Sequence, residues 1–570
     1  MNPIHRVITA GVLGLAFSLP AQHTEAGAFV HLFEWQWSDV AQECEQFLGP
    51  KGFSAVQVSP PQEHIQGSAW WTRYQPVSYQ LDSRGGNAAG FADMVARCNA
   101  AGVDVYADAV INHTAHGSGY GSAGSFYDSG SRSYPVYSGN DFHPACDIQP
   151  SDYGSNAGRV RNCQLVGLPD LDTAANYVQD TLAGYLNHLT SLGVKGIRID
   201  AAKHMAPGDI AGILNRTNDP LYVFQEVIDL GGEAVSAIEY TGLSDVTEFR
   251  YSASLGDVFK NQKLAYLNGF GESWGFLAGS DAVVFTDNHD NQRGHGAGGG
   301  NVLTYKDGSL YNLANVYMLA WPYGYPKIMS SYGFSNGDQG PPGQAVYQGG
   351  SAQCGGAWIC EHRWQAIANM VEFRNVTDGS GVTHWWDNGN NQIAFGRGSK
   401  GFVVINRENN SLSRNFSTGL PDGSYRNVAG NNACVSVTNG QVALTVPAME
   451  AAALHIGANC TGSEPPPAGD TVSTGFLCRN GTTTPGQSVY VTGNTGGLGN
   501  WAPANAVKLE PTGYPTWSGT IELPANATVE WKCLKRNEQD PQAQLVWQSG
   551  ANNQVQTGAA GSSTTTSGGF

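Results

Sequence analysis

Short runs of β-branched and other apolar residues recur along the N-terminal part of the chain, and Gly, Pro, Asn or Asp bounds each run. Helical patterns lie between several of these runs, for example over residues 91–101 and 174–192. Repeated alternation of strand and helix is typical of parallel β/α units. Eight such strands over about 350 residues predict an α/β fold, a (β/α)8 or TIM barrel with insertions. The expected strands span residues 28–33, 53–59, 103–110, 194–199, 222–224, 246–249, 282–285 and 326–330.

Two other patterns interrupt and follow the barrel. Residues 114–172, after the third strand, are rich in Gly, Ser, Tyr and Asp and include Cys146 and Cys163. A structureless loop of that length is uncommon, so the segment predicts a small inserted subdomain. The barrel then spans 27–375, and an antiparallel β domain is expected over 376–460. Its strands are expected at residues 382–386, 392–396, 401–405, 441–446 and 451–456.

The composition changes again after residue 460. Residues 461–470 are rich in Pro and predict a linker. Residues 471–557 form another β-rich unit, for which we expect a β-sandwich. Residues 558–570 are almost all Gly, Ser, Thr and Ala, and this composition predicts a disordered tail.

Composition and charge narrow the classes of partner. Only 14% of the 570 residues are charged, and the formal net charge is −17. A negative protein disfavours nucleic acid and anionic membranes as partners. Few charges together with 74 Gly, 14 Trp and 24 Tyr indicate long ordered loops and a neutral ligand. We expect a monomer that is not anchored in a membrane.

The first 26 residues resemble a secretory signal. A weak basic start at His5 and Arg6 precedes an apolar run over residues 7–19. Cleavage is expected after Ala21 or Ala26, and the mature protein is expected to be secreted and extracellular. Ten cysteines without a CxxC pair fit an oxidising compartment and predict five disulfides, whose pairing the spacing leaves open.

Polar residues follow four of the expected barrel strands. The C-terminal ends of barrel strands carry active sites, so these side chains should converge in one cleft. A pair of carboxylates, one acting as nucleophile and one as proton donor, is what retaining glycoside hydrolysis requires. Arg198, two residues before Asp200 and on the same strand face, would keep that carboxylate ionised. The polar residues at the strand ends are Asn112, His113, Asp200, Glu226, His289 and Asp290.

These segments resemble the sequence motifs of alpha-amylases, in the chloride-dependent, animal-like branch of that glycoside hydrolase family. The resemblance covers residues 27–460. Four main motifs match at 108–113 (DAVINH), 196–204 (GIRIDAAKH), 225–229 (QEVID) and 285–290 (FTDNHD). Further similarity lies at 31–35 (HLFEW), 56–61 (VQVSPP), 168–172 (LPDLD) and 294–298 (GHGAG).

The resemblance implies a role for each matched residue. Asp200 would be the nucleophile, Glu226 the general acid and base, and Asp290 the transition-state stabiliser. The implied activity is endo-acting hydrolysis of internal α-1,4 bonds in starch, glycogen and maltooligosaccharides, with retention of configuration. The implied substrate-binding residues are Trp70, Trp71, Tyr74, Gln75, His113, Arg198, Lys203, His204 and His289.

The resemblance also implies two bound ions. Structural calcium would bind the side chains of Asn112 and Asp170 and the backbone oxygens of Arg161 and His204, and so tie the insertion to the barrel. Chloride would lie among Arg198, Asn288 and Lys327 as an activator. Many family members carry Arg at the last of these positions, and Lys offers a point charge instead of a planar fork.

Residues 471–557 resemble a family 20 starch-binding module. Trp501 and Trp547 match its stacking tryptophans, and Lys532 and Asn553 match its hydrogen-bonding positions. Flat aromatic faces suit the apolar faces of glucose rings. The family resemblance further implies the disulfide pairs Cys44–Cys98, Cys146–Cys163, Cys354–Cys360, Cys434–Cys460 and Cys478–Cys533.

Two other functions remain as alternatives. Similar starch modules occur on exo-acting, maltooligosaccharide-forming amylases, but the barrel sequence resembles the endo-acting branch more closely. A non-catalytic starch-binding protein is the second alternative, and the presence of Asp200, Glu226 and Asp290 counts against it.

Overall fold

A computed structural model describes residues 27–460, 471–499, 501, 503, 506–525, 527–538, 543–559 and 562–570. The predicted signal at 1–26 and the predicted linker at 461–470 lie outside the described residues. The chain divides into two units, one ending at Ala458 and one beginning at Asn459. Within the described part of the chain, no helix has the length and apolar character needed to cross a membrane.

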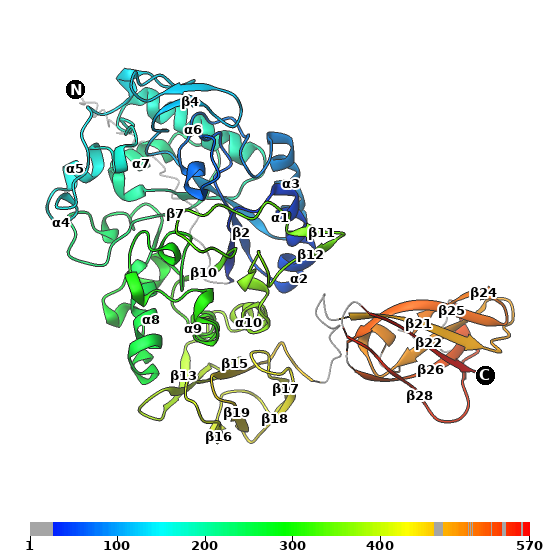
Figure 1. The fold of residues 1–570 in the computed structure, drawn as a ribbon. Helices are drawn as coiled ribbons and strands as arrows, with labels where there is room; N and C mark the ends of the chain where they lie inside the picture. The colour runs from blue at the N-terminus through cyan, green and yellow to red at the C-terminus, as the bar shows by residue number, and fades with distance from the viewer. Residues whose placement is uncertain are drawn as a thin grey trace, which may run out of the picture. The chain divides into compact units, whose positions relative to one another are not determined.

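Eight parallel strands form a closed barrel in the first unit, as the alternation of strands and helices predicted (Figure 1). Each strand begins and ends within two residues of its expected position. The strands are β1 (Phe29–Leu32), β2 (Ala55–Val58), β3 (Asp104–Ala109), β6 (Gly196–Ile199), β7 (Tyr222–Gln225), β8 (Asp245–Thr247), β9 (Ala282–Val284) and β10 (Tyr325–Ser330).

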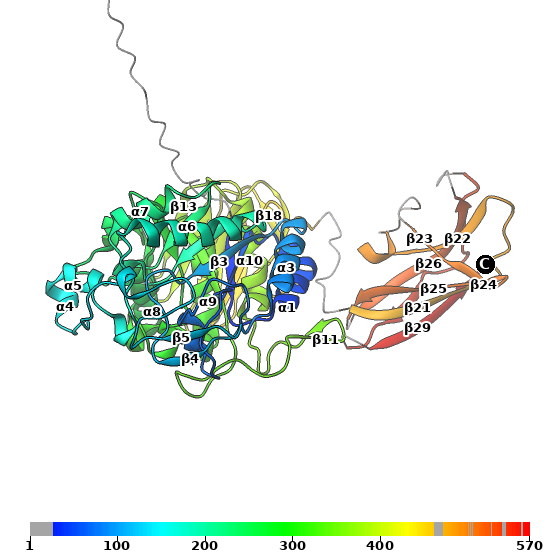
Figure 2. The same cartoon turned by 90° about the horizontal axis from the view of Figure 1, so that it is seen from above.

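Helices surround these strands in Figure 1, and Figure 2 shows the same elements from above. Helix α3 (Ala88–Ala100) illustrates why they form: the Asn87 side chain caps its first turn by accepting from the Gly90 N–H at 3.0 Å. Its buried residues, Phe91, Met94, Val95 and Cys98, recur at helical spacing and face the barrel. The main helices are α1 (Trp37–Glu43), α2 (Gly49–Lys51), α3 (Ala88–Ala100), α6 (Asn176–Ser191), α7 (Pro207–Leu214), α8 (Phe249–Asn261), α9 (Ser309–Ala320) and α10 (Gln365–Val376).

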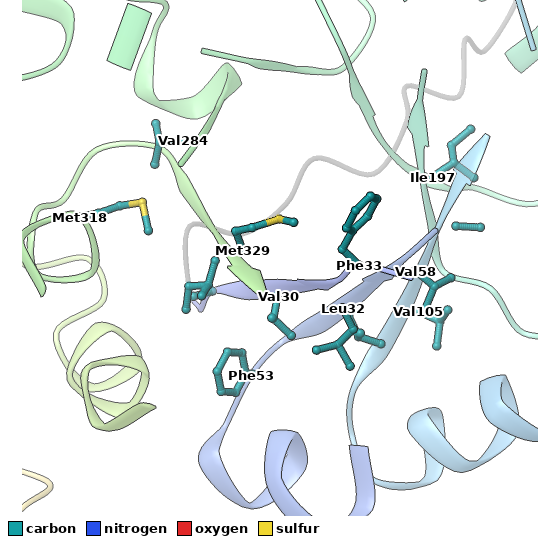
Figure 3. Close-up of a cluster of buried hydrophobic side chains, with 14 of the residues drawn as sticks. Val30, Leu32, Phe33, Phe53, Val58, Val105, Ile197, Val284, Met318 and Met329 are labelled. Atoms are coloured by element: carbon teal, nitrogen blue, oxygen red, sulfur yellow. The ribbon is translucent and has the colours of Figure 1, made fainter. Parts of the chain in front are cut away.

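The barrel strands bury side chains on both faces. The outward side chains join a large core with the helices, and Figure 3 shows part of it, with Val30, Leu32, Val58 and Val105 on neighbouring strands. The inward side chains at the N-terminal end form a separate, mainly aromatic plug. It consists of Phe29, Ala55, Tyr106, Tyr222, Phe224, Val283 and Tyr325.

Successive side chains of a strand point to opposite faces, so residues two positions apart share a face. His31, Asp108 and Lys327 follow Phe29, Tyr106 and Tyr325 of the plug at that spacing. The barrel interior therefore changes from aromatic to charged toward the C-terminal ends of its strands.

The inserted segment 114–172 contains two short strands and two short α-helices, which is the small subdomain that its length predicted. They are β4 (Ser118–Tyr120), β5 (Phe126–Asp128), α4 (Asp152–Ser155) and α5 (Ala157–Asn162). The chain also forms a short hairpin after β10, from β11 (Tyr347–Gln348) and β12 (Ser351–Ala352).

After the barrel, two four-stranded antiparallel sheets pack around one apolar core. The first has the order β13 (Val382–Asp387), β14 (Gln392–Arg397), β15 (Gly401–Asn406) and β20 (Glu450–His455). The sequence did not predict β16, β17 or β18, because most of their side chains are exposed or only half-buried. The second sheet has the order β16 (Leu412–Ser417), β19 (Gln441–Val446), β18 (Cys434–Thr438) and β17 (Gly423–Arg426).

The second unit is a sandwich of two sheets, as predicted, around a core that includes Trp517 and Trp531. One sheet has the order β24 (Glu510–Gly513), β25 (Thr516–Pro524), β21 (Thr471–Arg479) and β29 (Ser563–Gly569). The other has the order β23 (Val507–Lys508), β22 (Gln487–Gly493), β26 (Thr528–Asn537) and β27 (Val546–Trp547), with β28 (Asn553–Gln556) also paired to β26.

The prediction of a disordered tail over 558–570 is wrong. Residues 563–569 form β29, which pairs in parallel with β21 from Ser473↔Ser563 to Arg479↔Gly569. Backbone hydrogen bonds define this strand, and Ser, Thr and Gly give no apolar alternation by which the sequence could reveal it. Phe570, which follows the strand, packs against the core of the sandwich.

Disulfide bonds form within each of the two units. Four of the pairs that the family resemblance implied are formed: Cys44–Cys98, Cys146–Cys163, Cys354–Cys360 and Cys478–Cys533. Cys434 and Cys460 are also disulfide-bonded.

A buried carboxylate fastens the long segment after β10 onto helix α1. Glu43 Oε1 lies 2.8 Å from His362 Nε2 and accepts from Arg363 Nε at 2.7 Å. Glu43 Oε2 accepts from the Tyr347 hydroxyl at 2.7 Å and from Arg363 Nη2 at 2.6 Å. Although burial raises the pKa of Glu43, these partners outweigh it and lower that pKa to about 2.

Glu43→Ala is expected to lower the free energy of unfolding by ~3–5 kcal/mol, because it leaves buried partners uncompensated. The native pKa of about 2 lies below the ordinary 4.5. The stabilisation is therefore complete above pH 4.5 and is lost as the pH falls toward 2. Urea denaturation of the wild type and variant across this range measures the difference.

Asp93→Ala is the matched control, since Asp93 pairs with Arg97 on the surface and its side chain is 63% exposed. Its expected cost is below ~1 kcal/mol at every pH. Equal losses for the two variants would contradict a stabilising role for the Glu43 network.

Candidate active site

A cleft of about 630 Å³ opens where the barrel strands end. Catalytic and substrate-binding candidates from separate parts of the sequence meet in it. It is lined by Trp70, Trp71, Tyr74, Gln75, His113, Tyr153, Leu165, Val166, Leu168, Asp200, Ala201, Lys203, His204, Glu226, Ile228, Glu233, His289, Asp290, His295, Gly296 and Asp338.

Arg198 of β6 lies beneath the cleft and is only 1% exposed. Its Nη1 contacts Asp108 Oδ1 at 2.5 Å and Asp200 Oδ1 at 2.8 Å, and its Nη2 contacts Glu226 Oε1 at 2.5 Å. One guanidinium thus neutralises part of the charge of three buried carboxylates. The two Nη1 contacts are charge-assisted hydrogen bonds, which fix direction as well as supplying energy.

The two central carboxylates are held as neighbours. Glu226 Oε2 accepts from the Ala201 N–H at 3.0 Å, directly after Asp200 in the chain. Ala201 adopts a left-handed φ of 50°, a strained conformation of the kind that gathers at functional sites. Burial raises the pKa of Asp200, and the charge of Arg198 opposes that rise.

Asp290 and His289 enter the cleft after β9. Burial, and then the charge of Glu226, raises the pKa of Asp290 to about 7. His289 Nε2 lies 3.4 Å from Asp290 Oδ2, and burial lowers the pKa of this imidazole. His289 is therefore uncharged at neutral pH, and its imidazole can donate a hydrogen bond to an uncharged ligand or accept one from it.

An aromatic wall flanks the carboxylates. Tyr74 stacks on His289 with ring centroids 5.1 Å apart, and its hydroxyl donates to Asp108 Oδ2 at 2.9 Å. His113 Nε2 lies 2.9 Å from the Tyr74 carbonyl oxygen. Trp70 is packed against its neighbours, whereas Trp71 is 37% exposed.

The other cleft residues that the sequence predicted are held by the inserted subdomain and the loop after β7. Gln75 Oε1 accepts from the His116 N–H at 3.1 Å. Lys203 donates to the Ile228 carbonyl at 2.5 Å and pairs with Glu233.

The predicted calcium residues gather between β3 and the insertion. His113 and Asp170 form a β-bridge, and the Leu171 N–H donates to the Asn112 carbonyl at 3.0 Å. The side-chain oxygens Asn112 Oδ1 and Asp170 Oδ1 are buried and have no hydrogen-bond partner among the described residues. His204 Nδ1 lies 2.8 Å from the Val160 carbonyl, which brings His204 next to Arg161. Uncompensated hard oxygens are what a calcium ion requires.

The predicted chloride residues also lie in the barrel interior. Lys327 is buried, and burial and the charge of Arg198 lower its pKa to about 8. Asn288 Oδ1 accepts from the N–H groups of Asp290 and Asn291, so its side-chain nitrogen is the group that faces other partners. The effect of the Arg198 charge on Lys327 shows that these two buried cations lie near each other.

In the second unit, the predicted sugar-binding residues lie on or beside adjacent strands. Trp547 on β27 is 38% exposed, and the Trp501 N–H donates to the Gly493 carbonyl at 2.9 Å. Lys532 on β26 donates to the Gly550 carbonyl at 2.7 Å, and Asn553 on β28 donates to Gln548 Oε1 at 2.9 Å.

Sequence reasoning missed several residues of the catalytic cleft. Asp108 was part of a quoted motif but received no role, although it accepts from Tyr74 and Arg198 beneath the cleft. Its signal was a carboxylate at an inward, buried position of strand β3. Glu233, His295 and Asp338 stand in irregular segments, where no periodicity marks the direction of a side chain, and Tyr153 lies in α4, which at 4 residues is too short to show one.

Comparison with known families and proteins agrees with this geometry. The family "Alpha amylase, catalytic domain" matches residues 52–220, "Alpha amylase, C-terminal all-beta domain" matches 384–457, and "Starch binding domain" matches 471–567. An alpha-amylase of Streptomyces violaceus is 46% identical over 567 residues, which cover 97% of this chain and 96% of that protein. The pancreatic alpha-amylase of Sus scrofa is 47% identical over 471 residues, or 74% of this chain and 92% of that protein.

A solved structure has the same fold over the first unit. A variant of alpha-amylase I from Eisenia fetida, in complex with maltohexaose, superposes with a TM-score of 0.73 at 43% identity, covering 77% of this chain and all of that one. Full-length similarity above 40% identity, together with the barrel and its carboxylate cleft, settles the relationship. The chain belongs to the alpha-amylase family and carries a starch-binding domain at its C-terminal end.

Proposed function

We propose that this starch-hydrolysing, endo-acting alpha-amylase cleaves internal α-1,4 bonds with retention of configuration, through Asp200, Glu226 and Asp290. The observation that carries the proposal is the contact of both Asp200 and Glu226 with the Arg198 guanidinium at the floor of the cleft. Starch, glycogen and maltooligosaccharides are the proposed substrates. Neutral sugars suit a cleft walled by aromatic rings and by imidazoles whose pKa burial lowers.

In the first step, an Asp200 oxygen attacks the anomeric carbon while Glu226 gives its proton to the leaving glycosidic oxygen. The bond between that carbon and oxygen breaks, and a glycosyl ester of Asp200 forms. In the second step, Glu226 removes a proton from water, which attacks the same carbon and releases Asp200. Asp290 stabilises the positive charge that develops on the sugar ring, while His113 and His289 bind its hydroxyls.

We propose that the remaining cleft residues position the glucan chain. Tyr74 would stack against the sugar at the cleavage point, and Trp70, Trp71 and Gln75 would line the groove beyond it. Lys203 and His204 would contact the product side. Arg198 would hold Asp200 ionised from below.

Calcium, when bound, would supply a fixed positive charge that joins the insertion to the barrel. Asn112, Asp170 and the backbone oxygens of Arg161 and His204 would hold it, which accounts for the two uncompensated side-chain oxygens. Chloride, when bound among Arg198, Asn288 and Lys327, would add a negative charge to the floor of the cleft. The ammonium of Lys327 would contact it as a point charge.

The starch-binding domain is proposed to hold granular starch through Trp501, Trp547, Lys532 and Asn553. We propose a secreted, extracellular monomer with a signal over residues 1–26. Residues 27–375 would form the catalytic barrel with its insertion over 114–172. Residues 376–460 would form the β domain and 461–470 the linker.

A product-length time course on soluble starch, with calcium and chloride present, tests the catalytic assignment. We expect a broad ladder of oligomers at early times, because an endo-acting enzyme cuts at internal bonds. Glu226→Gln should lower kcat by ~10²–10⁴-fold, the usual contribution of a general acid. Glu45→Gln, at an exposed carboxylate outside the cleft, is the control and should retain the wild-type rate. One dominant oligomer from the first minutes would instead indicate exo-acting cleavage.

Calcium removal should lower the melting temperature. At free calcium near one hundred times the dissociation constant, binding adds about 2.7 kcal/mol to folded-state stability. Scanning calorimetry with and without chelator measures the shift, and Asn112→Ala should abolish most of it. Asn268→Ala, at an exposed position, should retain it. A wild-type melting temperature that does not respond to chelator would refute the calcium site.

Replacing both Trp501 and Trp547 by Ala should lower adsorption to raw starch granules by about tenfold or more, the equivalent of ~1.4 kcal/mol. Hydrolysis of soluble starch should persist, because the barrel carries the catalytic groups. Sedimentation of granules and assay of the unbound enzyme measures adsorption. Val546→Ala, beside Trp547 on β27, is the matched control. Equal loss of adsorption and soluble activity in the double variant would contradict the assignment.

A further inference from the structure

A buried arginine lies behind the residues that enter the cleft after β9. Arg293 ends a 3₁₀ turn over Asn291–Arg293, which begins directly after Asp290. It is only 8% exposed and is not among the residues that line the cleft. Among the described residues, no carboxylate forms an ion pair with it. A buried cation without such a partner is costly, so other contacts must stabilise it.

Three aromatic rings lie against this guanidinium. Its Cζ is 4.4 Å from the ring centroid of Phe334 and 4.8 Å from the centroids of both Phe33 and Tyr332. Phe33 follows β1, Tyr332 follows β10 and Arg293 follows β9, which are consecutive strands of the barrel. The faces of aromatic rings attract a cation, most strongly where water is excluded. The ends of three strands thus build an aromatic box, made of Phe33, Tyr332 and Phe334, around one positive charge.

The segment that carries Phe334 is held against the chain around Trp70. Trp70 Nε1 donates to the Gly337 carbonyl at 2.7 Å. The backbones also approach closely, since a Cβ at Gly340 would lie 1.7 Å from the Ser68 carbonyl oxygen. The Phe334 side of the aromatic box is therefore fixed in place.

Arg293 hydrogen-bonds to both peptide groups of Asp290. Its Nη1 donates to the His289 carbonyl at 3.0 Å, and its backbone N–H donates to the Asp290 carbonyl at 2.9 Å. The Asp290 carbonyl also accepts from the His295 N–H at 3.0 Å, and Asn288 Oδ1 accepts from the Asp290 N–H at 3.0 Å. Because its backbone is fixed on both sides, the Asp290 carboxylate has a set direction, which stabilisation by a preorganised charge requires.

The charge of Arg293 also acts on this carboxylate. Burial and then the charge of Glu226 raise the pKa of Asp290 to about 7. The positive charges of Arg198 and Arg293 oppose this rise. Arg198 already contacts three carboxylates at the floor of the cleft, and Arg293 contacts none of them. The charged and titratable groups that face Asp290 are Glu226, Asp108, Arg198, His289 and Arg293.

We propose that Arg293 is a positioning residue of the hydrolysis, which fixes the direction of the Asp290 carboxylate and supplies a positive charge beside it. This inference rests on the proposed function, because it takes Asp290 as the group that stabilises the charge on the sugar ring. The aromatic box holds the cation in a buried place without an ion-pair partner. Its charge therefore acts on Asp290 through a medium of low dielectric, where such effects are strong.

Arg293→Gln removes the charge and keeps a hydrogen-bond donor, and its rate on a chromogenic maltotrioside is measured across the pH range of activity. We expect kcat to fall about tenfold or more with KM nearly unchanged, because Asp290 acts in the transition state. The acid limb of the kcat profile should move to higher pH, because without this cation Asp290 takes up its proton at a higher pH. Arg293→Lys should restore the acid limb and only part of kcat, since an ammonium lacks the planar fork.

Arg397→Gln is the matched control. Arg397 of β14 is also buried, and it donates to the Ala320 carbonyl at 2.6 Å and the Ser380 carbonyl at 2.8 Å, but it lies in the β domain. Its replacement should lower the melting temperature and leave the pH profile of the wild type. Circular dichroism measures the folded fraction of each variant, and rates are expressed per folded enzyme.

An acid limb of Arg293→Gln at the wild-type position, or an Arg293→Lys variant no more active than Arg293→Gln, would overturn the positioning role. Should Arg293→Gln fail to fold, Arg293→Lys carries the test alone: a lowered kcat with unchanged KM supports the role, and a wild-type kcat overturns it. Asp290→Asn with the wild-type rate would instead overturn the proposed function.

Discussion

The catalytic cleft depends on one buried positive charge. Without the Arg198 guanidinium, Asp108, Asp200 and Glu226 would place three carboxylates close together in a barrel interior, where unpaired charge is costly. With it, each carboxylate has a charged partner and a set direction. The same arrangement leaves Tyr74 fixed, because its hydroxyl donates to the Asp108 oxygen that the guanidinium does not contact.

The barrel supports this charge through the alternation of its strands. Aromatic side chains fill the N-terminal end of the interior and exclude water from below. Two residues further along the same strands come His31, Asp108 and Lys327. Chemistry is thereby placed at one end of the barrel and packing at the other, as in barrel enzymes generally.

Much of this architecture could be predicted from the sequence, and the reasons differ from region to region. Buried strands such as Val105 to Ala109 can be predicted from their runs of mainly apolar residues. Asp200 and Glu226 can be recognised because each carboxylate directly follows such a strand. Strand β29 could not be predicted, since its pairing with β21 uses backbone groups that every sequence has. Asp338 lies in an irregular loop, and only the folded chain brings it to Trp71.

The close approach of Gly340 to Ser68 has a consequence for changing this protein. A Cβ at position 340 would lie 1.7 Å from the Ser68 carbonyl oxygen, so any residue larger than Gly at 340 would have to displace the backbone at Ser68. The two loops behave as a single module in any exchange with a relative. Replacing residues 333–340 alone by those of a relative would change only one side of the contact between the two loops. Replacing them together with residues 67–71 would transfer both sides of that contact.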